Sequence, residues 1–421
     1  MQNFNGRLPN GVELYTCLNP KLTSFCLTLW VRDGAMHDPP ERHGLAHFLE
    51  HATFRAISER LGGQLYHHLR AEGLAFDACT SDSHVRFELS GPVAAWPAAL
   101  RLLLWILEPP VVSVAGLQRE RLRVQAEIRE NAAEDTTDYF ARRKVWPGTP
   151  LCRTIEGTAA SVNRMGFDAL REAHARWFRR GNFFVSAAGC VPDPDGLVAA
   201  LSALDPAAGD PPTPFTAPVP ERFLHRDAAV YVDERSFTHL TFAFDVDTAA
   251  CTEVELTLME EYLLGDSGAL YLALSEDTGL TYAVDGYTQV HDNAGCLMFD
   301  FDVEPGRALD AVRAAVAALN AAKAAPDAAA FIAGYASSEG TRADAPQTMA
   351  SYWGFDNGLR RCGFSDAGDR LAVCAAVPPE RLRALLRETL AADRCTLCAF
   401  GSPRRLREDA LREPLFDLDD R

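Results

Sequence analysis

The sequence predicts an α+β protein built from two tandem units that share one order of strands and helices. Its 421 residues are roughly two to three times the length of a usual domain, so two domains with sizeable cores are favoured over one. A segment with six prolines, 204–223, divides the chain almost in half and shows neither helical nor strand periodicity. Similar elements follow one another in each half.

In the first half, hydrophobic periodicity predicts strands and helices that pack into one unit. Apolar runs of strand length open and close it, and longer helical patterns lie between them. The expected elements are, in order, a strand at 24–34, a helix at 42–62, a strand pair or one long strand at 75–91, helices around 92–108 and 113–132, and a closing strand at 183–190.

In the second half, three stretches mirror elements of the first. They are a strand at 238–246 that matches the first strand, a helix at 252–264 that matches the first helix, and a strand at 394–403 that matches the closing strand. We therefore expect an N-terminal domain at 1–205, a linker of polyproline character at 206–222 and a C-terminal domain at 223–421.

The net charge of −17 at pH 7 limits the classes of partner. Phosphate backbones and anionic lipid surfaces would be repelled over much of the molecule, so we expect neither nucleic acid nor a membrane to bind. Solvation of an ordinary globular surface is the simpler explanation of the acidity. An acidic chamber that collects basic peptides is the alternative.

Eleven cysteines lie along the chain without a disulfide framework, which predicts a reducing, cytoplasmic location. Cys395 and Cys398 form a CxxC pair inside a strand-like run, so core packing is favoured over redox chemistry. The first residues lack a basic region followed by an apolar one, and no run of about eighteen apolar residues occurs. We expect neither export by a signal peptide nor a membrane span.

The stretch HGLAHFLEH places three histidines and a glutamate in a segment that is otherwise mainly apolar. On a helix, His47 and His51 lie one turn apart on the same side, with Glu50 beside them. Two imidazoles at this spacing can reach one zinc ion at about 2.0–2.1 Å and leave the glutamate free to act as a base. The alternative is that the histidines are core residues satisfied by backbone carbonyls.

A zinc site needs a third protein ligand. His43 lies eight residues before His51, about 12 Å along a helix axis, so one ion cannot bind all three histidines, and His43 is expected to start the helix or support the ligands. The helix at 113–132 offers Glu120 and Glu127, two turns apart at the edge of its apolar stripe. A carboxylate that faces a core needs a cation or a metal; two solvated glutamates are the alternative.

Glu127 follows His51 by 76 residues, and the resulting pattern HxxEH…E resembles that of the M16 peptidases, a family that includes pitrilysin, insulin-degrading enzyme and mitochondrial processing peptidase. Five stretches resemble parts of that family in the same order, over nearly the whole chain: LPNGVELY, DGAMHDPPERHGLAHFLEHATF, AFDACTSDSHVRFELSG, PLCRTIEGT and GLTYAV. The resemblance implies two tandem homologous domains of the LuxS/MPP-like metallohydrolase type, each a mostly antiparallel sheet with helices packed on one face.

The resemblance also implies a role for each site residue. His47, His51 and Glu127 match the ligands of one zinc ion per chain, Glu50 matches the general base, and Glu120 matches a carboxylate that helps hold the ligands. Three protein ligands leave a fourth position for water, whose pKa zinc lowers toward about 7. Glu50 would take the proton of that water and return it to the leaving amine.

Substrate binding in the family uses an extended peptide that adds to the edge of the sheet near the metal. The matching strand here would hold the peptide through the backbone of Asp77, Ala78, Cys79, Thr80 and Ser81. The family usually has Asn where Asp77 stands, a departure that touches no metal ligand.

The C-terminal half departs from the family at one position. Active members supply an Arg and a Tyr that reach the substrate near zinc; Tyr282 matches the Tyr, but Ala269 stands at the Arg position. No Arg occurs between Arg235 and Arg307, and a methyl group cannot stabilise an oxyanion. The chain therefore resembles the zinc-bearing subunit of a heterodimer whose homologous partner supplies the Arg/Tyr pair. A homodimer is the less favoured alternative.

The sequence thus predicts a zinc endopeptidase that cleaves small unfolded peptides in a clamshell chamber. Leader-peptide processing of a ribosomally made peptide and general scavenging of fragments are both compatible with it. The alternative from another class is a non-catalytic subunit that binds peptides or supports an assembly, which some family members have become. Retention of Glu50 favours the enzyme, because a structural chain need not keep it.

Overall fold

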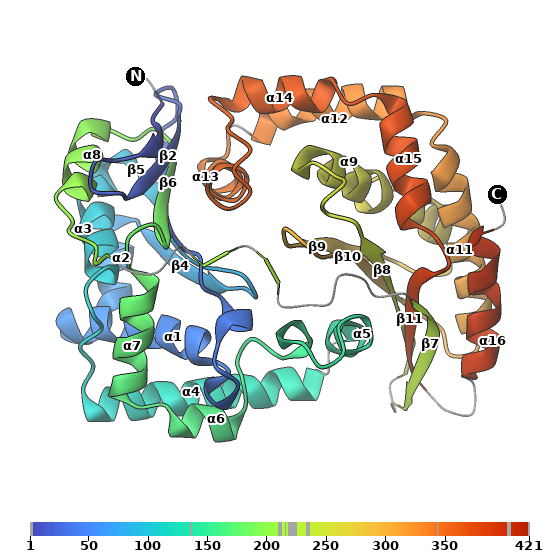
Figure 1. The fold of residues 1–421 in the computed structure, drawn as a ribbon, viewed down its shortest axis with the longest axis horizontal. Helices are drawn as coiled ribbons and strands as arrows, with labels where there is room; N and C mark the ends of the chain where they lie inside the picture. The colour runs from blue at the N-terminus through green and yellow to red at the C-terminus, as the bar shows by residue number, and fades with distance from the viewer. Residues whose placement is uncertain are drawn as a thin grey trace. The chain divides into compact units, whose positions relative to one another are not determined.

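The computed structural model describes residues 3–134, 137–208, 213–214, 216–217, 225–232, 236–342, 344–401 and 406–419. Contacts divide the chain into two compact units that interleave along the sequence. Unit 1 contains 1–134, 154–215 and 338–370, and unit 2 contains 135–153, 216–337 and 371–421. Each unit is built around one β-sheet (Figure 1).

The sheet of unit 1 has six strands in the order β1-β2-β6-β3-β5-β4. Strands β2 and β6 are parallel, and the other neighbouring pairs are antiparallel. The order places β4 at an edge of the sheet. The strands are β1 Asn5–Arg7, β2 Glu13–Leu18, β3 Ser24–Val31, β4 Ala75–Thr80, β5 Val85–Pro92 and β6 Phe183–Gly189.

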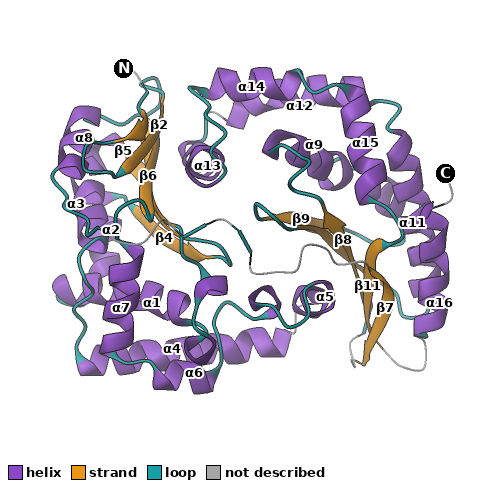
Figure 2. Ribbon diagram, in the orientation of Figure 1, coloured by secondary structure: helices purple, strands orange, loops and turns teal. Residues whose placement is uncertain are grey.

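One face of this sheet forms the core of unit 1 together with a layer of helices (Figure 2). Leu29, Phe87 and Val185 stand side by side on that face, because alternate residues of a strand point to the same side. Helix α4 packs on α1 outside this layer. The helices on this side are α1 Leu45–Arg60, α2 Leu65–Glu72, α3 Trp96–Ile106, α4 Val114–Glu134, α6 Ala159–Arg164, α7 Phe167–Trp177 and α8 Pro194–Ser202.

A helix from the second half of the sequence packs on the opposite face of this sheet (Figures 1 and 2). Helix α13 (Pro346–Trp353) contacts β3 and β6, and a π-helical turn at Gly354–Leu359 continues it. Trp30 Nε1 donates to Ser186 Oγ (2.9 Å), which donates in turn to the carbonyl of Ala350 (2.8 Å). The exposed face that β3 and β6 would otherwise present is therefore covered within unit 1.

The sheet of unit 2 repeats this order without the first edge strand, as β7-β11-β8-β10-β9. Strands β7 and β11 are parallel, and the other neighbours are antiparallel. Phe242, Phe244 and Phe299 stack on its buried face, with ring centroids 4.9 and 6.3 Å from Phe299. The strands are β7 His225–Val232, β8 Thr238–Val246, β9 Asp285–Val290, β10 Gly295–Val303 and β11 Arg394–Gly401.

Unit 2 also contains a helix from the other half of the sequence. Helix α5 (Thr137–Val145) contacts β8 and β11, and the ring of its Phe140 lies 4.5 Å from that of Tyr231 in β7 and 5.0 Å from that of Phe400 in β11. The chain passes between the units within α12 (Ala328–Arg342) and α14 (Ala367–Ala375). The remaining helices of unit 2 are α9 Glu253–Leu264, α10 Ala269–Tyr271, α11 Ala308–Ala324, α15 Pro379–Thr389 and α16 Glu408–Arg412.

The predicted α+β architecture of two similar, mostly antiparallel sheets is confirmed. The region 75–91 is a strand pair, β4 and β5. The placement of α5 and α13 in units built mainly from the other half was not predicted. The predicted linker at 206–222 lies largely outside the described residues, and the domain boundaries at 1–205 and 223–421 stay predictions.

Two further predictions concern the CxxC pair and the apolar helices. Cys395 and Cys398 are buried in β11, as core packing requires, and burial raises the pKa of Cys395. Among the helices of the described ranges, none combines the length and the apolar composition that a bilayer span needs.

Candidate metal centre

Helix α1 carries the HxxEH stretch in a nearly fully buried position. Its apolar side chains join the core of unit 1, while His47 and Glu50 are buried polar groups on the same helix. Gly44, directly before the helix, has a φ of 89° and lies so close to the Glu156 carbonyl that a Cβ would overlap it. Only glycine fits there, so the start of the helix is fixed just before the first ligand candidate.

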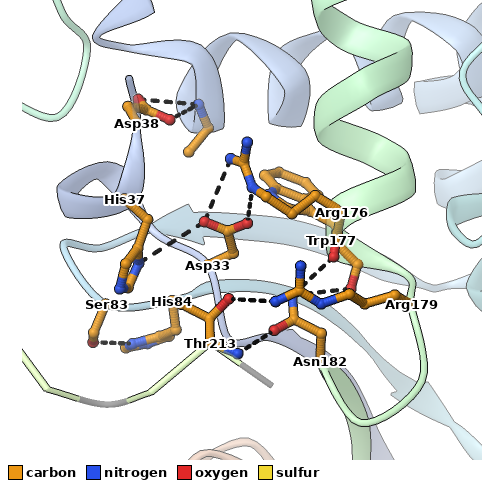
Figure 3. A network of polar contacts seen from close by, with 11 residues as sticks. Asp33, His37, Asp38, Ser83, His84, Arg176, Trp177, Arg179, Asn182 and Thr213 are labelled. Carbon is orange, nitrogen blue, oxygen red and sulfur yellow. Dashed lines mark hydrogen bonds and ion pairs between the residues drawn. The ribbon is translucent and has the colours of Figure 1, made fainter. Parts of the chain in front are cut away.

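Two buried carboxylates anchor the segment before α1 (Figure 3). Asp33, which is fully buried, pairs with Arg176 of α7. Asp38 accepts hydrogen bonds from the backbone N–H groups of Gly44 (2.9 Å) and Ala46 (3.1 Å), donors that a helix start leaves without an intrahelical partner. Burial raises the pKa of Asp38 to about 7, helped by the charge of Asp33 and opposed by these hydrogen bonds.

Helix α4 brings Glu120 and Glu127 against α1. Their seven-residue spacing places both carboxylates on one side of the helix. Arg121, between them in sequence, donates to the carbonyl oxygens of Val162 (3.4 Å) and Met165 (2.8 Å) at the end of α6. These bonds fix the rotation of α4 about its own axis and its position along that axis. They therefore also fix the positions of the two carboxylates.

His47 and His51 of α1 and Glu127 of α4 converge on one point. Nε2 of each histidine lies 3.4 Å from a different carboxylate oxygen of Glu127. This separation exceeds a usual hydrogen bond of about 2.9 Å. It matches the roughly 3.3–3.4 Å that separates two donor atoms bonded at about 2.0–2.1 Å to a tetrahedral zinc ion. Donor types and spacing both fit zinc.

Glu120 and Arg55 support this group from outside. Glu120 Oε2 lies 3.4 Å from His51 Nδ1, and Arg55 donates to Glu120 Oε1 through Nε (2.6 Å) and Nη2. An imidazole whose Nδ1–H meets a carboxylate presents an unprotonated Nε2 to a metal. Arg55 was not predicted as part of the site, although it follows His51 by the same four residues that separate His47 from His51.

The carboxylates of Glu120 and Glu127 determine the protonation state of the imidazole of His51. Burial lowers the pKa of His51, but hydrogen bonds to Glu120 and Glu127 outweigh burial and raise that pKa to about 9. Hydrogen bonds from His47 and His51 hold the pKa of Glu127 well below its usual range. Burial favours a high pKa for Glu120, but His51 and Arg55 lower it. Without a metal the site therefore keeps a proton on His51, which a bound cation would replace.

The two candidate histidine ligands are supported unequally. His47 Nδ1 is buried, and no described residue forms a hydrogen bond with it, whereas His51 Nδ1 faces Glu120. His43 lies outside the group of converging ligand atoms, and its carbonyl accepts a hydrogen bond from Ser161 Oγ (2.7 Å) at the start of α1. This position matches the expected helix-start role of His43.

Glu50 lies on the same helix but outside the group of three converging residues. Glu50 is 8% exposed, and its Oε2 accepts a hydrogen bond from Thr80 Oγ1 (2.6 Å). The predicted role of Thr80 was through its backbone, and no local pattern in the sequence indicated this side-chain contact. A carboxylate that binds no metal stays available as a proton acceptor.

The residues predicted to hold a substrate lie at a sheet edge. Asp77, Ala78, Cys79 and Thr80 belong to β4, and Ser81 follows it. Strand β4 pairs with β5 on one side, and within the described residues no strand pairs with its other side. An open strand edge whose last residue contacts Glu50 is suited to the addition of an extended peptide.

The two positions singled out in the C-terminal half lie in unit 2. The side chain of Tyr282 is 94% exposed, and its carbonyl accepts a hydrogen bond from Ser275 Oγ (3.3 Å). Ala269 is the first residue of the short helix α10. A role for Tyr282 in substrate binding stays a prediction.

Comparison with known proteins gives consistent matches. The family described as Insulinase (Peptidase family M16) matches residues 18–159, and the one described as Peptidase M16 inactive domain matches 164–333. The uncharacterized zinc protease YmxG of Bacillus subtilis is 23% identical over 308 residues, 68% of this chain and 70% of that protein. Cytochrome b-c1 complex subunit 1 of Bos taurus is 23% identical over 185 residues, 44% of this chain and 38% of that protein.

Solved structures share the fold over almost the whole chain. The peptidase M16 inactive domain from Pseudomonas fluorescens has a TM-score of 0.80 at 16% identity and covers 95% of this chain and 98% of its own. A protease from Helicobacter pylori has a TM-score of 0.79 at 16% identity, with 95% and 99% covered. The two family matches together span most of the sequence, and the two sheets repeat the same order. The chain therefore belongs to the M16 peptidase family, in its form with two tandem domains.

Proposed function

We propose that this protein is a zinc-dependent endopeptidase. The observation that carries the proposal is the convergence of His47, His51 and Glu127 at separations that fit zinc, with Glu50 outside the group of converging ligand atoms. Structural zinc sites are usually closed by four protein ligands, whereas catalytic ones use three and keep a position open. The name of the relative from Bacillus subtilis, a zinc protease, supports the same activity.

The residues around the site have distinct tasks in this chemistry. When bound, zinc would act as a Lewis acid that acidifies a water molecule and polarises the carbonyl of the scissile peptide bond. Glu50 takes the proton of the attacking water and delivers it to the leaving amine. Glu120 orients His51, and Arg55 holds Glu120. A dication and Arg55 together balance the charges of Glu50, Glu120 and Glu127, so the loaded site carries no net buried charge.

The proposed substrates are small unfolded peptides bound in an extended conformation. The open edge of β4 can pair with a peptide main chain regardless of its sequence, through the backbone of Asp77–Ser81. A folded protein has few free strands that could add to this edge, which restricts the substrates to unstructured segments.

We propose that a homologous partner subunit completes the substrate site. Ala269 replaces the Arg that active family members supply, so a second copy of this chain would bring the same methyl group and no donor. A heterodimer with a partner that carries the Arg/Tyr pair removes this defect. The likeness to a subunit of the cytochrome b-c1 complex supports assembly with other chains. Such a pair could process the leader of a ribosomally made peptide or scavenge fragments.

A non-catalytic peptide-binding or assembly subunit is the second candidate function. Two findings favour it: residues 164–333 match a domain described as inactive, and a relative is named as a subunit of the cytochrome b-c1 complex. The two candidates differ in whether Glu50 has a task, because a binding subunit needs no general base.

Zinc content and peptide cleavage of Glu50→Gln distinguish the two functions. We expect about one zinc per chain in the wild type and in the variant, and a fall in cleavage of about 100- to 10,000-fold in the variant, with or without a partner subunit. Glu72→Gln, an exposed glutamate of α2, is the matched control and should behave as wild type. Stoichiometric zinc without cleavage in any pairing would favour the binding subunit, and metal-free protein would overturn the zinc assignment.

A further inference from the structure

The hydrogen bond between Thr80 and Glu50 joins the open strand edge to the proposed general base. Thr80 Oγ1 donates to Oε2 of Glu50 at 2.6 Å, and among the described residues no donor contacts Oε1. One carboxylate oxygen is therefore occupied by a fixed donor, and the other is left to receive a proton. A charge-assisted bond of this length restricts rotation of the carboxylate about its terminal torsion.

A clamped turn sets the position of this hydroxyl. The N–H groups of Ala35 and Met36 donate to the carbonyl oxygens of Ser81 and Asp82, at 2.9 Å each. These bonds tie the turn directly after Thr80 to the segment that leads into α1. The end of β4 and the start of α1 are thus held by the same short piece of backbone, and the donor is organised before any substrate arrives.

We propose that Thr80 is a positioning residue that holds the Glu50 carboxylate in one orientation at the end of the peptide-binding edge of β4. The inference rests on the proposed peptidase function. A peptide that adds to the edge of β4 therefore meets a carboxylate that the Thr80 hydroxyl already holds, with Oε1 free to face the attacking water. Without the hydroxyl, Glu50 samples several orientations, and only a fraction of bound substrate meets a correctly placed base.

Two substitutions separate the hydroxyl from the shape of the side chain. Thr80→Val is nearly isosteric but lacks the donor, and we expect kcat to fall about 10- to 100-fold with KM within about threefold of wild type. Thr80→Ser keeps the hydroxyl and should retain most of kcat. Thr53→Val is the matched control: it removes a hydroxyl that binds only the Leu49 carbonyl of the same helix, and should leave both constants unchanged.

Two further readouts do not depend on turnover. Zinc affinity from chelator competition, and the Kd of a labelled extended peptide for the metal-free protein, should equal the wild-type values in Thr80→Val.

A double variant adds a test that does use the rate of cleavage. In a Glu50→Gln background, Thr80→Val should cause no further loss of rate, because Thr80 acts through Glu50.

The possible outcomes separate the inference from the function on which it rests. An unchanged kcat in Thr80→Val, in an enzyme that cleaves peptides, would overturn the role of Thr80 and leave the peptidase function standing. A loss of zinc or of peptide binding in that variant would also overturn it, since Thr80 would then be structural. A zinc-loaded wild type that cleaves nothing with any partner would overturn both.

Discussion

At the residue scale, the charges of the metal centre meet on His51. Its Nε2 faces Glu127 and its Nδ1 faces Glu120, each at 3.4 Å, whereas His47 has a carboxylate only at Nε2. Because Glu120 is also bound by Arg55, its carboxylate supports the imidazole without moving into the ligand position. Glu120 should therefore adjust the affinity for zinc, while the three converging residues determine whether zinc binds at all.

Replacement of Glu120 tests this division of roles. Glu120→Gln should lower zinc affinity about 10- to 100-fold, because the neutral amide no longer stabilises the Nδ1–H of His51. Competition with a chromophoric chelator measures the change. Glu130→Gln, an exposed glutamate on the same helix, should bind zinc as the wild type does. An unchanged affinity in Glu120→Gln would show that the 3.4 Å contact with His51 has no influence on the metal.

The raised pKa of His51 predicts that zinc binding releases a proton. In the metal-free protein the pKa of His51 is raised to about 9, so its imidazole is protonated at pH 7, and zinc binds only the neutral form. We expect zinc binding at pH 7 to release the proton of His51, in addition to any proton that the zinc-bound water loses, and the share from His51 falls toward zero above pH 9. Zinc titration calorimetry in buffers of different ionisation enthalpy measures the number of protons released. No buffer dependence at pH 7 would contradict the charged imidazole.

At the element scale, the parts of the site that follow local periodicity could be predicted from the sequence. The four-residue spacing of His47 and His51 places them on one helix face, and the same spacing would have found Arg55. The contact of Thr80 with Glu50 could not be found this way, because it depends on backbone bonds between two separate loops. Side-chain contacts that depend on tertiary hydrogen bonds have no corresponding periodic pattern in the sequence.

Helix α7 contains a buried histidine that should make unit 1 sensitive to acid. His174 is 4% exposed, and burial lowers its pKa to about 4, although the carbonyls of Ile106 and Glu108 favour the charged form. In the unfolded chain a histidine titrates near 6.5. Between these values the unfolded state binds more protons, so stability falls as the pH drops from 6.5 toward 4, by about 2 kcal/mol at pH 5.

Urea unfolding at pH 7 and pH 5 measures this contribution. The loss of stability on acidification should be smaller by about 2 kcal/mol in His174→Gln than in the wild type. Other titrating groups are the same in both proteins, so the difference isolates His174. The control is His67→Gln, which replaces an exposed histidine on α2. Its stability should change with pH as that of the wild type does. Equal losses in wild type and His174→Gln would show that His174 is not the cause.

At the scale of the whole molecule, the sequence did not predict that each unit contains a helix from the other half of the chain, α13 in unit 1 and α5 in unit 2. The alternation of apolar residues predicts the strands of both sheets and the helices beside them, as for β3 and β8. A short helix such as α13 has an apolar side that suits either sheet, and its sequence does not say which one it covers. Close complementarity to Trp30 decides, because a Cβ on Gly354 would overlap the indole.

This exchange of helices predicts that the N-terminal half cannot fold well alone. A fragment of residues 1–215 contains His47, His51 and Glu127, but it lacks α13, so Trp30 and the rest of that sheet face meet water. We expect the fragment to bind a hydrophobic dye and to unfold at lower urea than the full chain, because a large apolar patch is exposed.

A second fragment, residues 216–421, should restore unit 1 when the two are mixed, because it returns α13 to β3 and β6. Dye binding should fall, and zinc affinity, which requires α1 and α4 to be held in place, should rise toward that of the full chain. The same second fragment with Gly354→Leu is the control: its side chain would collide with the Trp30 ring, so it should restore neither property. If the fragment of residues 1–215 alone binds zinc and resists urea as the full chain does, α13 is not needed, and the core under α1 suffices to hold the ligands.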